Sequence, residues 1–368
     1  MRYSLNIRFC FYWMILIFWM TACSKEGKTP VLPPDNQSFK LQIPKDNKIY
    51  HAAFPDFGGT EDLVSAERIV DFEELCQREI TWAYFSNNWT VEKGGIKFPF
   101  QEVMTIHQTG KVPFIRMMPR STFDAGEADD IYTMEKFLSG AFDEDIKQWA
   151  IEAKHTNIPL LVEFGTEVNG DWFPWNASYN GGSTKNHYGA PGLYDGMERF
   201  RDTYRRIIDI CREQGANNIT WFYHCDVYNN PDNNWNTKAG YYPGDDYIDW
   251  IGLSVYGAQT PDEDWMKFED ILTENWEEIM SISPQGKPLA ILEWGVVDNV
   301  QHQKPEWISD AMSSIKPGGK FYPNIKAVSY WHENFDDTIL KIDESPESLS
   351  AYRAAVNDEI FVSIPSFQ

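Results

Sequence analysis

Two glutamates stand where strands of a parallel sheet are expected to end. Glu167 follows the apolar run 158–165, and Glu293 lies near the end of another such run. Because side chains alternate along a strand, Glu163, Gly165 and Glu167 are expected to share one face, with Glu167 at its end. Two carboxylates about 5–5.5 Å apart can cleave a glycosidic bond with retention: one protonates the leaving oxygen and the other attacks the anomeric carbon.

Aromatic side chains accompany these acids. Aromatic residues make up 15% of the chain, and Trp172 and Trp175 come directly after Glu167. A carboxyl walled by Trp172 and Phe173 would have a raised pKa through desolvation, as a general acid requires. A set of four tryptophans, Trp175 among them, lies in or just after predicted strand ends and is expected to rim a carbohydrate cleft: Trp89, Trp175, Trp235 and Trp294.

The elements that must position these residues are eight short β-rich runs that alternate with amphipathic helical segments. The runs cover 51–58, 80–86, 112–119, 158–167, 218–226, 248–257, 287–295 and 325–333. Such alternation fits either a (β/α)8 barrel or an open doubly wound sheet. No glycine-rich phosphate loop follows the first run, and polar or aromatic residues stand at nearly every strand end. We therefore expect an α/β protein, a single (β/α)8 TIM barrel with its site at the carboxyl ends of the strands.

Three segments resemble glycoside hydrolase family 26. The stretch "GTEVNGDWFPW" (165–175) is similar to that family's acid/base motif, usually His-Glu-Met-Asn-Gly followed by an aromatic pair. Residues 241–257 resemble its sixth-strand signature, and "KPLAILEWG" (287–295) resembles its nucleophile strand. The likeness runs from about residue 50 to residue 361. It implies a retaining endo-glycoside hydrolase of a β-linked polysaccharide, most often β-1,4-mannan.

The resemblance also implies a role for individual residues. Glu167 would be the general acid/base and Glu293 the nucleophile. Tyr256 would donate a hydrogen bond to the nucleophile, which favours its ionised form. Trp172 would line the cleft near the cleaved bond, and Trp331 on the eighth strand would be a sugar platform.

Two positions depart from the family pattern. Thr166 stands where the family usually has His, and Glu163 stands where it commonly has an inward Arg. We expect Glu163 to pair with Arg116 of the third strand. Asn169 is expected either to contact a sugar hydroxyl or to fix its loop. The expected substrate-binding set is Trp172, Trp175, Tyr256, Trp331, Asn169, Thr166 and Arg116.

Charge and motif content narrow the function classes. The formal net charge of −23 disfavours nucleic acid as a partner, since phosphate binding needs a basic surface. The spacing of His224, Asp226, His332 and Glu333 matches no metal motif, so these residues are interpreted as polar groups in a cleft. No cofactor is predicted, and a monomer is expected. The alternatives are a β-glucanase or xylanase of the same fold, or a non-catalytic surface glycan-binding lipoprotein.

The N-terminal segment is interpreted as a targeting signal. Residues 1–22 carry two arginines and then an uncharged apolar run, as in a secretory signal peptide. The tetrapeptide that ends at Cys23 resembles a bacterial lipobox, so Cys23 is predicted to be acylated. Residues 23–48 would form a flexible tether and 49–368 the catalytic domain. This predicts an outer-membrane lipoprotein that faces the cell surface or the periplasm, with Cys76, Cys211 and Cys225 as buried thiols.

Overall fold

The strands close into the predicted barrel. The computed structural model describes residues 39–124, 126–298, 303–335 and 338–368, so the predicted signal peptide and Cys23 lie outside the described residues. Eight parallel strands pair in chain order, and β1 pairs with β8 to close the ring. They are β1 (Ile49–Phe54), β2 (Trp82–Asn88), β3 (Val112–Met118), β4 (Leu160–Phe164), β5 (Ile219–Asp226), β6 (Trp250–Tyr256), β7 (Leu289–Gly295) and β8 (Ile325–Trp331).

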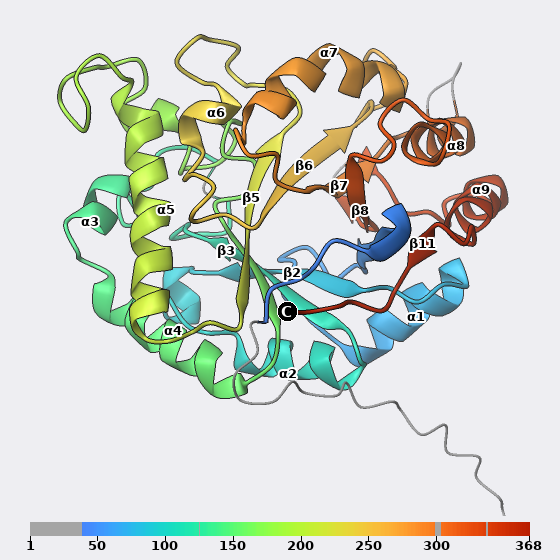
Figure 1. Cartoon of the computed structure of the whole chain (residues 1–368), viewed down its shortest axis with the longest axis horizontal. Coiled ribbons are helices and arrows are strands. Elements are labelled where there is room, and N and C mark those ends of the chain that lie inside the picture. The colour runs from blue at the N-terminus through green and yellow to red at the C-terminus, as the bar shows by residue number, and fades with distance from the viewer. Residues whose placement is uncertain (1–38, 125, 299–302, 336–337) are drawn as a thin grey trace, which may run out of the picture.

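Helices cover the outside of this ring (Figure 1). The longest, α5, buries Phe200, Tyr204 and Ile207, which recur at helical spacing on one face. The helices are α1 (Ala66–Cys76), α2 (Phe100–Gln108), α3 (Met134–Leu138), α4 (Asp143–Thr156), α5 (Asp195–Glu213), α6 (Lys238–Tyr241), α7 (Phe268–Ser281), α8 (Lys304–Ile315) and α9 (Pro346–Val356). Short pieces complete the described fold: 3-10 turns η1 (Lys45–Asn47), η2 (Val91–Lys93) and η3 (Ala177–Tyr179), the pair β9 (Asn334–Phe335) and β10 (Thr338–Ile339), and β11 (Phe361–Val362) beside β1.

The folded domain begins earlier than predicted. Leu41 is 4% exposed, its amide donates to the hydroxyl of Thr220 at 2.9 Å, and it forms a bridge with Phe367. The prediction of a flexible tether up to residue 48 is therefore wrong for its last part, because residues 39–48 contain apolar side chains that the barrel buries. The first strand also starts at Ile49 rather than at residue 51.

Aromatic rings fill the barrel interior below the functional end. Trp82, Phe114, Phe222 and Trp250 contact one another with ring centroids 4.7–6.4 Å apart. Two residues further along three of these strands, on the same faces, come Tyr84, Arg116 and His224. An apolar layer therefore supports a polar layer, as the stacked layers of such barrels allow.

The polar layer is set by strand register. Arg116 on β3 lies opposite Ser86 on β2 and Glu163 on β4, so these three side chains meet at one level. On the other side of the ring, Ser254 of β6 lies opposite Glu293 of β7 after an irregularity in their pairing.

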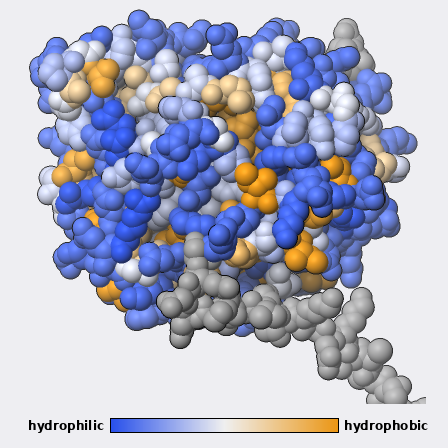
Figure 2. Space-filling view, in the orientation of Figure 1, coloured by the Kyte–Doolittle hydropathy of each residue, from blue (hydrophilic) through white to orange (hydrophobic). Residues whose placement is uncertain are grey.

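The outer surface is largely hydrophilic. Figure 2 shows hydrophilic residues over most of one face, with apolar residues scattered among them. Within the described ranges, no helix combines the length and apolarity that a membrane crossing requires. Cys76, Cys211 and Cys225 are free and buried, which confirms the prediction for these three thiols.

Candidate active site

Glu167 is presented by a tight turn that leaves strand β4. The strand ends at Phe164, and the backbone then takes positive φ at Gly165 (64°) and at Glu167 (47°). The expected alternation from Glu163 to Glu167 is therefore wrong, because the chain has left the sheet before Glu167. A Cβ at position 165 would lie 2.7 Å from the ring of Phe200, so the turn needs glycine there. A left-handed glutamate is a strained conformation that functional sites commonly hold.

Trp172 forms a wall beside this glutamate. The Glu167 side chain is buried at 8% exposed, and the Trp172 indole N–H donates to its Oε2 at 2.8 Å. Trp172 itself is 37% exposed, so the indole also faces solvent. The ring lies directly over Gly170, where a Cβ would come within 2.2 Å of it. The prediction that Trp172 lies beside the acid is therefore confirmed.

Glu293 occupies a different environment at the end of β7. The Tyr256 hydroxyl donates to Glu293 Oε2 at 2.9 Å, and Arg116 Nη2 lies 3.2 Å from Oε1. Burial raises the pKa of Glu293 to about 7, against the pull of Arg116 and with help from the negative charge of Glu167. Burial and the Glu293 charge raise the pKa of Tyr256 well above its ordinary value, so its phenol keeps the proton that it donates.

Arg116 joins three carboxylates beneath the site. Its Nη1 donates to Glu61 Oε2 at 2.9 Å, and its Nε forms a 3.5 Å ion pair with Glu163, besides the contact with Glu293. The predicted Arg116–Glu163 pair is thus present, and it is the longest of the three. Arg116 is 2% exposed, does not line the cavity described below, and has its charge shared by these carboxylates, so its predicted contact with substrate is wrong in this arrangement. Glu61 belongs to a loop after β1, where no sequence pattern indicated it.

His224 on β5 extends the polar layer. Its Nδ1 lies 3.0 Å from Glu163 Oε2 and 2.7 Å from the hydroxyl of Thr166, and its Nε2 lies 2.9 Å from the hydroxyl of Ser254. Burial lowers the pKa of His224, but the Glu163 carboxylate outweighs this and raises it. Burial works against ionised Glu163, yet His224 and Arg116 hold its pKa below the ordinary value. The two form a buried ion pair.

Thr166 is therefore a structural residue. It is 0% exposed, and its hydroxyl is used by His224, so the prediction that Thr166 contacts substrate is wrong. The side chain follows a left-handed glycine, which turns it inward rather than toward the cleft.

Two predicted sugar platforms are packing residues. Trp175 is 0% exposed, stacks on Phe173 at 4.4 Å and donates its N–H to the carbonyl of Thr166. Trp331 is 3% exposed, stacks on Phe54 at 4.0 Å, and has the Arg116 guanidinium over its ring at 4.9 Å. Both predictions of sugar contact are wrong here, because the barrel already covers the ring faces. Trp89 and Trp294 are buried too, so the predicted rim of tryptophans is also wrong for them.

Asn169 fixes its loop. It is 0% exposed, and its amide N–H groups donate to the carbonyls of Asp226 and Tyr228, each at 2.9 Å. Its oxygen accepts from the Asp226 amide at 2.8 Å. Of the two roles that the sequence left open, the loop-fixing one is observed, and the predicted sugar contact is wrong because the amide is already satisfied.

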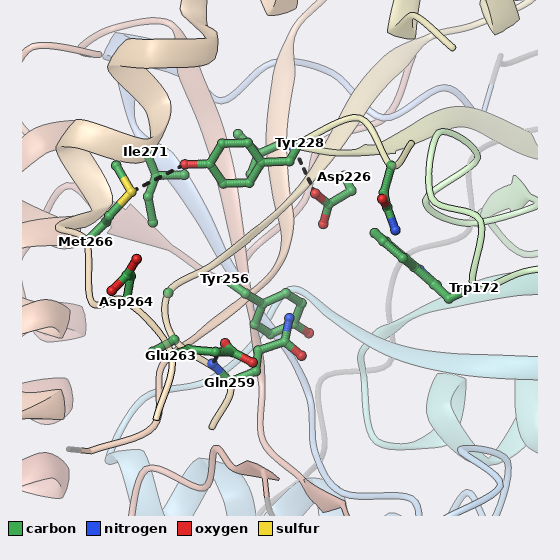
Figure 3. Close-up of a pocket in the computed structure, with 13 residues that line it drawn as sticks. Trp172, Asp226, Tyr228, Tyr256, Gln259, Glu263, Asp264, Met266 and Ile271 are labelled. Carbon is green, nitrogen blue, oxygen red and sulfur yellow. Dashed lines mark hydrogen bonds between the residues drawn. The ribbon is translucent and has the colours of Figure 1, made fainter. Parts of the chain in front are cut away.

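A cavity of about 350 Å³ lies between Trp172, Asp226, Tyr228 and Tyr256 (Figure 3). Trp172, which bonds Glu167, and Tyr256, which bonds Glu293, both line this cavity. The other walls come from the ends of β5 and β6, from the loops after them and from Ile271 of α7. Its lining residues are Trp172, Asp226, Val227, Tyr228, Asn230, Tyr256, Gly257, Ala258, Gln259, Glu263, Asp264, Met266 and Ile271.

The chemistry available at this site follows from its charges. Glu167 has a neutral indole donor, whereas Glu293 has a phenol and a guanidinium, which stabilise an anion. Their charges also interact with each other across the mouth of the barrel. Two carboxyls in such different surroundings can divide the roles of acid/base and nucleophile. Among the described residues, no group of three or more His, Cys, Asp and Glu side chains is arranged to hold a metal ion.

Comparison with known proteins places the chain among carbohydrate-active enzymes. Residues 118–310, more than half of the chain, match the model of the family described as Glycosyl hydrolase family 26. Endoglucanase H of Acetivibrio thermocellus is 27% identical over 303 residues, or 81% of this chain and 29% of that protein. A mannan endo-1,4-beta-mannosidase of Bacillus subtilis is 26% identical over 150 residues, or 40% of this chain and 34% of that protein. The chain thus spans about a third of the length of these curated relatives.

Among solved structures, the catalytic domain of an endo-beta-1,4-mannanase from Bacillus sp. JAMB-750 superposes with a TM-score of 0.62 at 17% identity. The match covers 90% of this chain and 95% of that domain. At this identity the likeness concerns the fold, and it agrees with the closed barrel described above.

Proposed function

Because this chain belongs to glycosyl hydrolase family 26, we propose that it is a retaining endo-glycoside hydrolase whose substrate is β-1,4-mannan. The observation that carries the proposal is the pair of buried carboxyls at the ends of β4 and β7. Glu167, held by the indole of Trp172, is the general acid/base. Glu293, held by Tyr256 and Arg116, is the nucleophile.

The reaction follows from these contacts. Glu167 gives its proton to the glycosidic oxygen while Glu293 attacks the anomeric carbon, which forms a covalent glycosyl-enzyme and releases the leaving sugar. Water then enters, Glu167 removes its proton, and the C–O bond to Glu293 breaks with retained configuration. Tyr256 and Arg116 stabilise the carboxylate each time Glu293 becomes an anion.

A panel of polymers tests the substrate. Reducing-sugar release and viscosity are measured on galactomannan, glucomannan, mixed-linkage β-glucan and xylan. We expect release from the mannans, a fast fall in viscosity, and β-configured first products by NMR. Because an endoglucanase matches 81% of the chain, β-glucan is the second substrate from which we expect release. Binding to a polymer without any release would contradict the enzyme and favour the glycan-binding protein.

The pH dependence of the reaction has a definite sign. Glu293 attacks only when ionised, and its pKa is about 7, so kcat/KM is expected to fall as the pH drops below about 7. Tyr256→Phe removes a donor to the ionised form, which raises the Glu293 pKa and moves this acid limb to higher pH. The measurement is the pH profile of kcat/KM. Tyr188→Phe, which removes a tyrosine that bonds Asp202, is the control, and an equal shift in it would contradict the prediction.

The membrane anchor is part of the proposal and rests on the sequence around Cys23. A tether that leaves the domain at residue 39 starts at the end of the barrel where the strands begin. Lys40 contacts Ile219 and Asp249 there, at the starts of β5 and β6. The catalytic mouth, at the opposite ends of these strands, would then face away from the membrane. We propose an outer-membrane lipoprotein that acts as a monomer at the cell surface or in the periplasm.

The anchor predicts a simple change in partitioning. Cys23→Ala removes the acylated residue, so the expressed protein should move from the detergent phase to the aqueous phase of cell extracts. Cys10→Ala, in the predicted signal peptide, should leave the protein in the detergent phase. Detergent retention of Cys23→Ala would contradict acylation at this residue.

A further inference from the structure

We propose that the cavity of Figure 3 binds the sugar on the leaving-group side of the cleaved bond, and that Asp226 hydrogen-bonds that sugar. The inference rests on the glycosidase activity proposed above and adds a substrate-binding residue to it.

Asp226 is fixed relative to the acid/base by the backbone. It is the last residue of β5, and the amide of Asn169 bonds both its N–H (2.8 Å) and its carbonyl (2.9 Å). Asn169 lies two residues after Glu167 in the same turn. One side chain therefore ties the turn that carries Glu167 to the strand end that carries Asp226.

The Asp226 carboxyl is buried but has bonding capacity to spare. The residue is 9% exposed, and Oδ1 accepts from the Tyr228 amide at 2.7 Å. Within the described ranges, no protein group bonds Oδ2. Figure 3 shows the carboxyl directed into the space between Trp172 and Tyr256. Oδ2 therefore has free capacity to bond a hydroxyl of a ligand in the cavity.

The charge state of this carboxyl suits a sugar. Burial raises the pKa of Asp226 well above its ordinary value, and the nearby negative charge of Glu167 raises it further. This shift favours the protonated form of Asp226, in which Oδ1 accepts from the backbone and Oδ2 can donate its proton to a hydroxyl.

The position of Glu167 decides which side of the substrate the cavity holds. A general acid must reach the oxygen of the departing sugar, so that sugar lies against the acid. Trp172, which bonds Glu167, forms one wall of the cavity, and Tyr256, which bonds Glu293, forms another. Asp226 lies on the Glu167 side of this cavity, because Asn169 ties it to the turn that carries Glu167. The remaining lining includes one more aromatic ring and the polar side chains of Asn230, Gln259, Glu263 and Asp264, which match a hydroxyl-rich ring.

Two substrates separate this role from a general loss of activity. One is the polymer that the wild type cleaves, and the other is the 2,4-dinitrophenyl β-glycoside of the disaccharide released from it. The second has no sugar on the leaving side. Asp226→Ala is expected to lower kcat/KM on the polymer about tenfold more than on the aryl glycoside. Asp226→Asn keeps an oxygen for Tyr228 and an N–H donor for the sugar, so it should restore most of the ratio.

Asp232→Ala is the matched control, because Asp232 is an exposed aspartate in the same loop and does not line the cavity. It should keep the wild-type ratio of the two rates. Equal losses of Asp226→Ala on both substrates, or an Asn variant as poor as Ala, would overturn the role of Asp226.

A wild type that cleaves none of the polymers tested would instead overturn the proposed activity. Calorimetric titration with mannopentaose would then decide whether Asp226 contacts sugar: weaker binding by Asp226→Ala supports this contact, and unchanged binding overturns it.

Discussion

Replacement of Glu293 by alanine is expected to lower kcat/KM on the cleaved polymer by about 10⁴-fold or more, because the variant lacks the carboxylate that forms the covalent intermediate in the proposed mechanism. Glu167→Ala should cost about 10²–10⁴-fold on the polymer, the range for loss of a general acid. Both residues are buried at the mouth, so thermal unfolding curves must accompany the rates to exclude misfolding.

The leaving group distinguishes the two variants. A 2,4-dinitrophenyl group departs without a proton, so Glu167→Ala should still be glycosylated quickly by an aryl glycoside, and release of the sugar should then be slow. Added azide can replace water in that second step and should yield a β-glycosyl azide. Glu293→Ala should instead yield the α-glycosyl azide, because azide attacks in place of the missing carboxylate.

The products of these two reactions, identified by NMR, decide the assignment. An α-azide from Glu167→Ala and a β-azide from Glu293→Ala would reverse the two roles. Full polymer activity in Glu293→Ala would remove the proposed nucleophile altogether.

Sequence patterns predicted the barrel and the two acids because both depend on local features. The eight apolar runs and their polar ends can be read one at a time, and the barrel brings these ends together whatever the loops do. The contacts of Glu167 with Trp172 and of Glu293 with Tyr256 follow from this placement.

The residues that sequence reasoning misplaced depend on contacts across the molecule. Trp175 and Trp331 have the right residue type and position for sugar stacking, but Phe173 and Phe54 already cover their rings. Thr166 was expected to face substrate, yet a left-handed Gly165 turns it toward His224. Only the packed structure decides which aromatic ring or hydroxyl stays free.

Asp226 illustrates the opposite error. The sequence identified it as a polar strand end, which is also the description of many residues that only close a loop. Its proposed role in sugar binding follows from two features of the structure. Asn169 holds Asp226 against the turn that carries Glu167, and one carboxyl oxygen of Asp226 remains free at the cavity. Neither feature has a sequence signature, since Asn169 reaches Asp226 across 57 positions.

Arg116→Met is expected to lower the free energy of unfolding more than any other single substitution proposed above. The residue is 2% exposed and carries the positive charge shared by Glu61, Glu163 and Glu293, at 2.9, 3.5 and 3.2 Å. Burial lowers the pKa of Arg116, but the three carboxylates, Glu293 first, raise it well above the ordinary value. Removal of one partner from a buried ion cluster typically costs about 3–5 kcal/mol, because the remaining charges stay desolvated. Urea unfolding at about pH 8 would measure this loss.

The pH dependence of the loss has a predictable sign. In the wild type, Arg116 and His224 hold the pKa of Glu163 below its unfolded value, so this group adds stability above the unfolded pKa and loses it as the pH falls through the folded pKa. Without Arg116 the folded-state pKa values of Glu163 and Glu293 rise, and ionised carboxylates then destabilise the fold. The deficit of Arg116→Met should therefore be larger at about pH 8 than at about pH 5.

Two further variants make this prediction specific. Arg120→Met removes another buried arginine, 5% exposed, which bonds Asn88 and forms no ion pair within the described ranges. Arg120→Met should lose less stability than Arg116→Met, and its loss should be nearly the same at about pH 8 and at about pH 5. Glu163→Gln added to Arg116→Met removes one uncompensated charge and should return part of the stability at about pH 8. If Arg116→Met and Arg120→Met lost the same stability at both pH values, the shared charge of Arg116 would not be what holds these carboxylates in place.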